Sequence, residues 1–150
     1  MTDALTFNPA TFTNAPFGLR VEKPWGYELI FTPPDKPYTG KILHLNAGKR
    51  ISLQYHDEKA ETIMLLHGRG VLLADNDRGQ LEEIEMEPMK GYSNVPGQRH
   101  RLIAIDDCDF VEASLPEMGN TYRLEDDSGR TTETAAMRAR ERYGSNDRHD

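Results

Sequence analysis

Short runs of β-branched, aromatic and other apolar residues recur between Tyr27 and Leu115, and most are separated by Gly, Pro, Asn or Asp. Runs of this kind are typical of strands in an all-β sandwich or barrel. No stretch of this region has the periodicity of an amphipathic helix. The sequence therefore predicts a single β-barrel domain. The predicted strands are Tyr27–Thr32, Lys41–Asn46, Ser52–His56, Thr62–His67, Gly70–Ala74, Leu81–Glu87, Tyr92–Val95, Arg101–Ile105 and Phe110–Ser114.

The two ends of the chain differ in composition from this central region. Residues 1–20 contain Asn, Thr, Pro and Gly with little periodicity, and we expect an N-terminal arm there. Residues 131–150 favour a helix around Thr134–Arg142, but this stretch has no wide apolar stripe. We therefore expect either a short helix or a frayed, disordered tail, and a barrel domain that spans residues 21–130.

The charge balance argues against several classes of partner. The 25 Asp and Glu residues outnumber the 18 Lys and Arg residues, so the net charge of -7 disfavours binding to nucleic acid or to an anionic membrane. No apolar run approaches the roughly 20 residues that span a bilayer, and the N-terminus lacks the pattern of a secretory signal. The only cysteine, Cys108, lies among three aspartates that disfavour a thiolate. We expect a cytoplasmic protein with an unreactive thiol.

One predicted strand carries polar side chains where burial is expected. In the strand that ends at His56, alternation puts Ser52, Gln54 and His56 on one face. The next stretch, Glu61–Leu66, is apolar on both faces and follows a tight turn, so both strands are expected to be buried. A polar row on a buried strand needs partners, and a metal ion or a bound polar ligand would supply them.

The residues around this strand follow a recognisable spacing. Between Gly48 and Gly68 the order is glycine, five residues, Gln-x-His, four residues, glutamate, six residues and glycine. Further along, Pro96–His100 opens another strand with the sequence PGQRH. These segments resemble the two signature motifs of the cupin superfamily, with Gln54 in place of the first histidine and one residue missing after the proline. The resemblance implies a cupin jelly-roll β-barrel.

The Gln-x-His variant is similar to the phosphomannose isomerases, whose metal ligands are Gln, His, Glu and His. Glu22–Tyr27, Gly48–His56 and Arg123–Arg130 also resemble the cupin domain of the type II enzymes of that family. The chain lacks several histidines and the tryptophan that commonly follow the Gln-Tyr pair. It also lacks the nucleotidyltransferase domain that often accompanies this module, so we expect no sugar-nucleotide synthesis on this chain.

The resemblance implies one divalent metal ion held by Gln54, His56, Glu61 and His100. This mixed set of nitrogen and oxygen ligands suits Zn or Mn, and also Fe, Co or Ni. The alternative interpretation is that these residues are ordinary hydrogen-bonded polar groups at the mouth of a barrel.

The activity that the resemblance implies is the isomerisation of mannose 6-phosphate and fructose 6-phosphate through an enediolate. Such a reaction needs a cation to polarise the carbonyl, a base to move the proton and a cationic cradle for phosphate. The candidate catalytic residues are Glu58, Lys49 and Arg130, with His44 and His67 as further titratable neighbours. The candidate substrate-binding residues are Arg50, Lys41 and Arg99.

Two other classes of function fit the same barrel: a non-catalytic sugar-binding or regulatory cupin, and a non-haem metal oxygenase or lyase. Other sugar chemistry, such as epimerisation, is also compatible with this barrel.

The roles of two further segments stay open. Trp25 could line the pocket, although we favour a core or interface anchor, and Glu125–Asp127 is either a closing loop or a solvated turn. Small cupins resemble one another in pairing through edge strands, so we expect a homodimer in which the N-terminal arm can cross to the second subunit.

Overall fold

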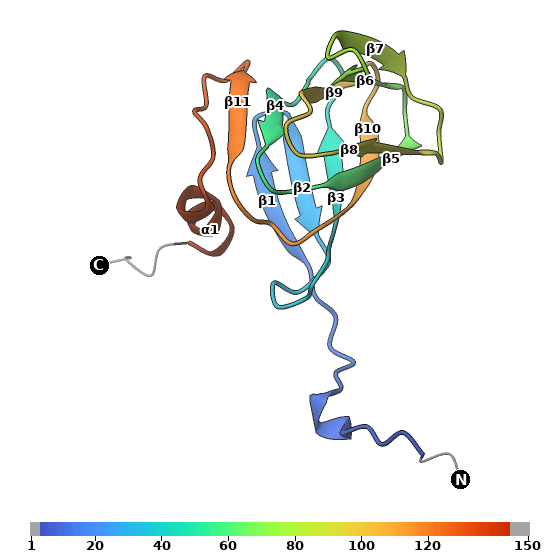
Figure 1. Cartoon of the computed structure of the whole chain (residues 1–150), viewed down its shortest axis with the longest axis vertical. Helices are drawn as coiled ribbons and strands as arrows, with labels where there is room; N and C mark the ends of the chain where they lie inside the picture. The colour runs from blue at the N-terminus through green and yellow to red at the C-terminus, as the bar shows by residue number, and fades with distance from the viewer. Residues whose placement is uncertain (1–3, 145–150) are drawn as a thin grey trace.

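The computed structural model describes residues 4–144, so the parts of the predicted arm and tail that fall on residues 1–3 and 145–150 lie outside it. The described chain forms two antiparallel sheets and one C-terminal helix (Figure 1). The elements are η1 (Pro9–Thr11), β1 (Leu19–Lys23), β2 (Gly26–Ile30), β3 (Thr39–Leu45), β4 (Leu53–His56), β5 (Glu61–His67), β6 (Gly70–Asp75), β7 (Leu81–Glu85), β8 (Gly91–Asn94), β9 (His100–Ala104), β10 (Cys108–Ser114), β11 (Thr121–Glu125) and α1 (Ala135–Tyr143).

The predicted all-β fold is confirmed. All nine predicted strands are present with small shifts at their ends, and β1 and β11 are added. One sheet has the order β1-β2-β3-β10-β5-β8 and the other β11-β4-β9-β6-β7, which is a jelly-roll arrangement. Strands β4 and β9 are joined in register by the single pair Gln54 and His100. Among the described residues, we find no helix with the length and apolar character needed to cross a membrane.

The apolar core lies between the two sheets, because alternate residues of each strand point inward. In β6 the burial pattern alternates strictly between buried and half-buried residues. Leu45, Leu102 and Phe110 are completely inaccessible, and Trp25 is 6% exposed at one edge of the same core. Removal of this apolar surface from water is the main favourable term in holding the two sheets together.

Trp25 is held in place by the tight turn between β1 and β2. Gly26 in this turn has a φ of 151°, and a Cβ atom at this position would collide with the backbone carbonyl of His44. The carbonyl of Trp25 accepts a hydrogen bond from the backbone N–H of Asn46 at 2.9 Å. Only glycine allows β2 to approach β3 this closely, which positions the indole ring at the barrel interior.

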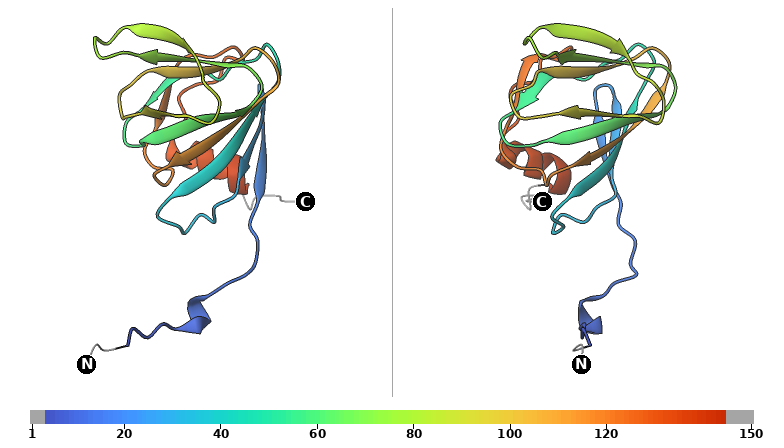
Figure 2. Two further views of the ribbon diagram at one scale, coloured as in Figure 1. Left: turned by 90° about the vertical axis from the view of Figure 1, so that its right-hand side faces the viewer. Right: turned by 45° about the vertical axis from the view of Figure 1, so that its right-hand side comes forward.

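The C-terminal stretch forms the helix α1, so the structure realises the helical alternative for this segment. The hydroxyl of Thr134 accepts a hydrogen bond from the backbone N–H of Met137, and Gly144 ends the helix with a φ of 72°. Figure 1 shows α1 beside β11 and the lower part of β1. The N-terminal arm runs away from the barrel in every view (Figure 2).

Candidate metal centre

Three side chains that the sequence groups by spacing converge inside the barrel. His56 ends β4, Glu61 begins β5 after the turn, and His100 begins β9. Nε2 of His100 lies 2.9 Å and Nε2 of His56 3.7 Å from Oε1 of Glu61. One ligand atom from each residue lies within 4.8 Å of the other two, and all three residues are buried. The cluster could therefore hold a metal ion.

The outer nitrogens of the two imidazole rings have hydrogen-bond partners. Nδ1 of His100 lies 2.9 Å from the carbonyl oxygen of Gln98 and must donate to it. Nδ1 of His56 lies 2.9 Å from the hydroxyl of Thr121. Each Nε2 atom is buried and faces Oε1 of Glu61, but neither contact has the geometry of a hydrogen bond, and no other described residue bonds to these nitrogens. Two such nitrogens beside a carboxylate fit a divalent cation, because a metal would satisfy them.

Gln54 lines the same cavity as His56 and Glu61. Its Oε1 accepts a hydrogen bond from the hydroxyl of Ser52 at 2.6 Å, which orients the amide. The polar face expected for this strand therefore consists of Ser52, Gln54 and His56, and it faces inward. Gln54 is the fourth residue that could contribute an oxygen ligand.

The pKa values of the three clustered residues reflect their burial and mutual contacts. Burial lowers the pKa of His56 and outweighs the effect of Glu61. Burial alone would lower the pKa of His100, but the contact with Glu61 raises it. For Glu61, burial would raise the pKa, but the charge of Lys59 and the two histidines lower it. Glu61 is therefore an anion at neutral pH, as a metal ligand must be.

The cavity beside this cluster has about 70 Å³ of free space and a highly charged wall. Its basic residues are Lys23, Lys41, Lys59, Arg123, Arg130 and Arg142. Its acidic residues are Glu28, Glu61, Glu112, Glu117 and Glu133. Burial of so many charges is tolerable only because they are paired.

Lys41 and Lys59 lie at the centre of this charged wall. Nζ of Lys41 is 2.5 Å from Oε1 of Glu28 and 2.6 Å from Oε1 of Glu117. Nζ of Lys59 is 3.3 Å from Oε2 of Glu112 and 3.4 Å from Oε2 of Glu61. Burial would lower the pKa of Lys59, but Glu112 and Glu117 raise it to about 12. Burial would also lower the pKa of Lys41, but Glu112, Glu117 and Glu28 raise it, so both lysines are charged.

Glu112 differs from the other carboxylates of the cavity. Burial, followed by the negative charge of Glu61, raises its pKa to about 7, against the opposing effect of Lys41 and Lys59. Sequence analysis did not select Glu112, but a signal was present. In the predicted strand Phe110–Ser114, alternation puts Glu112 on the same face as the buried Phe110.

Two of the predicted catalytic residues lie away from the cavity. Glu58 is exposed in the turn after β4, because this turn directs its neighbour Lys59 inward instead. Lys49 is exposed in the turn after β3. Neither side chain lines the cavity. The other titratable neighbours, His44 and His67, contact Asp109 at 2.7 and 3.3 Å and do not line the cavity either.

The predicted arginines divide into two groups. Arg130 lines the cavity and is held by Asp126 at 2.9 Å. Arg50 is exposed and forms two hydrogen bonds with Asp127, each of 2.8 Å, whereas Arg99 pairs with Asp75 at 2.7 Å. Neither of these lines the cavity; Lys41, the third predicted substrate-binding residue, does.

The acidic stretch Glu125–Asp127 anchors basic side chains, because Asp126 and Asp127 hold Arg130 and Arg50.

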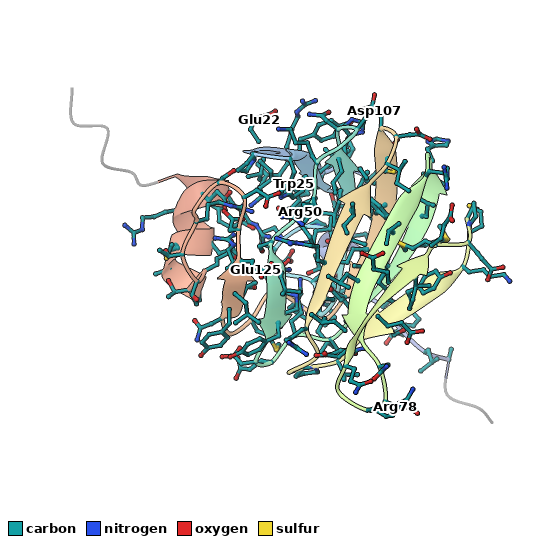
Figure 3. The ribbon with its side chains drawn as sticks, turned by 90° about the horizontal axis from the view of Figure 1, so that it is seen from above. Glu22, Trp25, Arg50, Arg78, Asp107 and Glu125 are labelled. Atoms are coloured by element: carbon teal, nitrogen blue, oxygen red, sulfur yellow. The ribbon has the colours of Figure 1, made fainter. Side chains whose placement is uncertain are left out.

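Trp25 has both of its expected roles, since it belongs to the core and also lines the cavity. Figure 3 shows Trp25 and Arg50 near the centre of the molecule when it is seen from above, and Asp107 and Arg78 at its periphery.

Comparison with solved structures bears on the fold of this chain. No protein-family model and no curated protein matches the sequence. Among solved structures, an oxalate decarboxylase of Bacillus subtilis with Mn(II) centres is 16% identical with a TM-score of 0.62, over 76% of this chain and 33% of that one. The capsular polysaccharide assembling protein CapF of Staphylococcus aureus is 17% identical with a TM-score of 0.56, over 85% and 34%. KdgF of Halomonas sp. is 12% identical with a TM-score of 0.53, over 64% and 84%.

These neighbours are cupin-fold proteins, and the chain shares their jelly-roll fold. The chain spans about a third of the length of the oxalate decarboxylase and of CapF. At these identities the likeness concerns the fold alone. The chemistry has to be argued from the cavity.

Proposed function

We propose that this cupin-fold protein is a metal-dependent enzyme that interconverts an aldose phosphate and a ketose phosphate, with mannose 6-phosphate and fructose 6-phosphate as the first pair to test. The observation that carries the proposal is the composition of one cavity. Two buried imidazole nitrogens without hydrogen-bond partners among the described residues lie beside a carboxylate, and the six basic residues of the adjoining wall outnumber its five glutamates. An anionic substrate and a divalent ion suit such a wall.

The ion would be held by Gln54, His56, Glu61 and His100. Zn and Mn both suit two imidazole nitrogens, one carboxylate and one amide oxygen. The oxalate decarboxylase of similar fold has Mn(II) centres. When bound, the ion would polarise the substrate carbonyl and stabilise the negative charge of an enediolate.

The proton would be moved by residues of the charged wall. The carboxyl group of Glu112 lies in the cavity beside Lys59, at 3.3 Å from its Nζ, and can accept a proton from one sugar carbon and return it to the next. The ammonium group of Lys59 can donate a hydrogen bond to the substrate oxygen on which charge develops. Both residues take the roles first considered for Glu58 and Lys49, which lie outside the cavity.

Arg130 is the candidate phosphate ligand among the residues that the sequence singled out. It lines the cavity beside the histidine cluster, which we call the inner cavity, and also an outer cavity of about 440 Å³. A substrate could therefore reach Arg130 from the outer cavity. The carboxylate of Asp126 accepts hydrogen bonds from the backbone N–H and from the guanidinium group of Arg130, and so fixes the position of this side chain. A guanidinium fork matches the geometry of phosphate oxygens.

A second candidate function is a non-haem iron oxygenase. The cluster of His56, Glu61 and His100 provides two histidines and one carboxylate, which is the ligand set of many such enzymes. Oxygen consumption with bound Fe(II) would identify this class.

The test is turnover of mannose 6-phosphate by metal-stripped protein that is reconstituted separately with Zn, Mn, Co, Ni and Fe. Activity restored by one metal, lost in His56→Ala and kept in His67→Ala, supports the isomerase, because His67 is exposed and outside the cavity. Oxygen uptake with Fe(II) and no isomerisation supports the oxygenase. Metal binding without either activity refutes both and leaves a binding protein.

A further inference from the structure

Helix α1 docks on the barrel through arginines rather than through an apolar face. Its large hydrophobic side chains, Met137 and Tyr143, are exposed, whereas Arg138 is buried. The side chain of Arg142, four residues later on the same helix face, is only 7% exposed. Most helices of globular proteins bury an apolar stripe, so a helix that buries two guanidinium groups needs another explanation.

Arg138 has structural partners, and none of its side-chain nitrogens is both buried and unpaired among the described residues. Its Nε donates to Oε1 of Glu133 at 2.9 Å and its Nη2 donates to the carbonyl of Gly119 at 3.1 Å. It does not line the inner cavity. This residue therefore accounts for the docking of the helix.

Arg142 lines the inner cavity and its guanidinium group is incompletely paired. Nη2 donates to Oε1 of Glu28 at 3.1 Å and to Oε1 of Glu117 at 3.3 Å. Its Nε is buried and makes no hydrogen bond with any residue between 4 and 144. A buried N–H donor on a charged group is costly to leave unpaired, so this atom is available to a ligand.

Arg123 on β11 has the same feature. Its side chain is 9% exposed, and it donates to the carbonyl of Thr131 at 2.9 Å and to Oε2 of Glu133 at 3.3 Å. Its Nε is also buried and unpartnered within the described part of the chain. Arg123 and Arg142 line the same cavity, and so does Glu133, the ion-pair partner of Arg123.

We infer that Arg123 and Arg142 complete the phosphate site proposed at Arg130, with which they share one cavity, as a receptor for a doubly charged oxyanion, and that α1 is thereby part of the substrate site. The ligand class rests on the proposed function, whereas the anion site rests on the two unpartnered Nε–H groups. Three carboxylates in the same cavity would repel an anion if they were unpaired, but basic side chains neutralise them. Glu28 and Glu117 are held by Lys41 and Arg142, and Glu133 by Arg138 and Arg123.

The experiment measures the binding of inorganic phosphate, mannose 6-phosphate and mannose to the full chain by isothermal titration calorimetry, with no turnover required. Arg142→Gln removes the charge and the Nε–H donor. Arg140→Gln is the matched control, because Arg140 is exposed on the same helix and has no ion pair among the described residues. We expect Arg142→Gln to weaken the binding of phosphate and mannose 6-phosphate by about tenfold or more. Arg140→Gln should stay within about twofold of the wild type, and the weaker binding of mannose should not change.

Arg142→Lys covers the case in which Arg142→Gln does not fold. It retains a positive charge beside Glu28 and Glu117 but removes the Nε–H donor, so it should melt near the wild-type temperature and still bind phosphate more weakly. A folded Arg142 variant that binds phosphate as tightly as the wild type overturns the inference, and so does a wild type that binds no phosphate. Phosphate binding that depends on Arg142, without turnover with any metal, refutes the isomerase and retains the anion site.

Discussion

Nε2 of His100 and Oε1 of Glu61 lie 2.9 Å apart, although the two residues belong to different sheets. The contact joins the start of β9 to the start of β5 across the barrel interior. His56 reaches the same carboxylate from the end of β4. The three strands that supply this cluster therefore meet at one point.

Substitution of any ligand residue should weaken the binding of a divalent metal. We expect Gln54→Ala, His56→Ala, Glu61→Gln and His100→Ala each to lower the affinity by at least about tenfold, because each removes one donor from the set. Metal content after dialysis, measured by plasma mass spectrometry, is the readout. His67→Ala is the control, since the His67 side chain is 72% exposed. Full metal content in all four variants would show that the coordination set is wrong.

The buried carboxylate of Glu28 should make the stability of the protein depend on acid pH. Burial would raise its pKa, but the charges of Lys41, Arg142 and Lys23 outweigh burial and lower the pKa from 4.5 to about 2. A lowered pKa stabilises the folded state above pH 4.5, and this stability is lost as the pH falls toward 2. The difference in unfolding free energy between wild type and Glu28→Gln should be on the order of 3 kcal/mol at pH 7. The difference should shrink in urea titrations as the pH falls from 4.5 toward 2. A constant difference would contradict the assignment.

Arg138→Ala should detach α1 without unfolding the barrel. It leaves the buried carboxylate of Glu133 with Arg123 as its only close ion-pair partner among the described residues, at a cost of about 3 kcal/mol. Hydrogen exchange should accelerate in residues 135–143 and stay unchanged in β5 and β10. Arg140→Ala, which removes an exposed arginine, should have no such effect. Equal acceleration throughout the chain would mean that α1 and the barrel unfold together.

Gly26→Ala should destabilise the fold more than a substitution at another glycine with positive φ. The new methyl group would meet the His44 carbonyl, so β2 and β3 would have to separate. Gly48→Ala is the matched control, because its φ is 78° but nothing lies within 4 Å of a Cβ there. We expect a loss of about 3 kcal/mol for Gly26→Ala and about 1 kcal/mol for Gly48→Ala in urea unfolding. Equal losses would show that the contact with β3 relaxes freely.

The N-terminal arm should take part in a homodimer. Its side chains Leu5, Phe7 and Phe12 are 85%, 73% and 65% exposed, which is a large apolar surface for an arm that runs away from its own barrel. Light scattering at micromolar concentration should give the mass of a dimer, and deletion of residues 1–17 should give a monomer. A monomeric wild type would remove this expectation.

Nine of the eleven strands were predictable because turn residues separate them clearly, and these nine include the edge strands β7 and β8. The other two edge strands were missed. β1 buries only Val21 and β11 only Thr121, so each gives a weak apolar signal. Helix α1 lacked an apolar stripe because it docks through Arg138 and Arg142.

The cavity wall was less predictable than the histidine cluster. A short turn relates His56 to Glu61 directly, and the resemblance to the two cupin motifs added His100, which lies on a distant strand. Lys59 was missed because a lysine in a turn is normally exposed to solvent. The sequence does not reveal which of two adjacent turn residues, Glu58 or Lys59, has its side chain directed into the barrel. The buried position of Lys59 depends on Glu112, a partner that lies 53 residues away.

The ion pairs of Lys41 also constrain how this protein can diverge. Its amine is shared by Glu28 and by Glu117, which lies 76 residues away in sequence. A lineage that loses this lysine removes the positive charge that Glu28 and Glu117 share and leaves both dependent on Arg142 and their other basic partners. A lineage that loses an acid first unbalances the lysine. Positions 28, 41 and 117 are therefore expected to covary among homologues. Substitutions of charged residues inside the barrel should occur together, whereas substitutions on its surface should occur independently of one another.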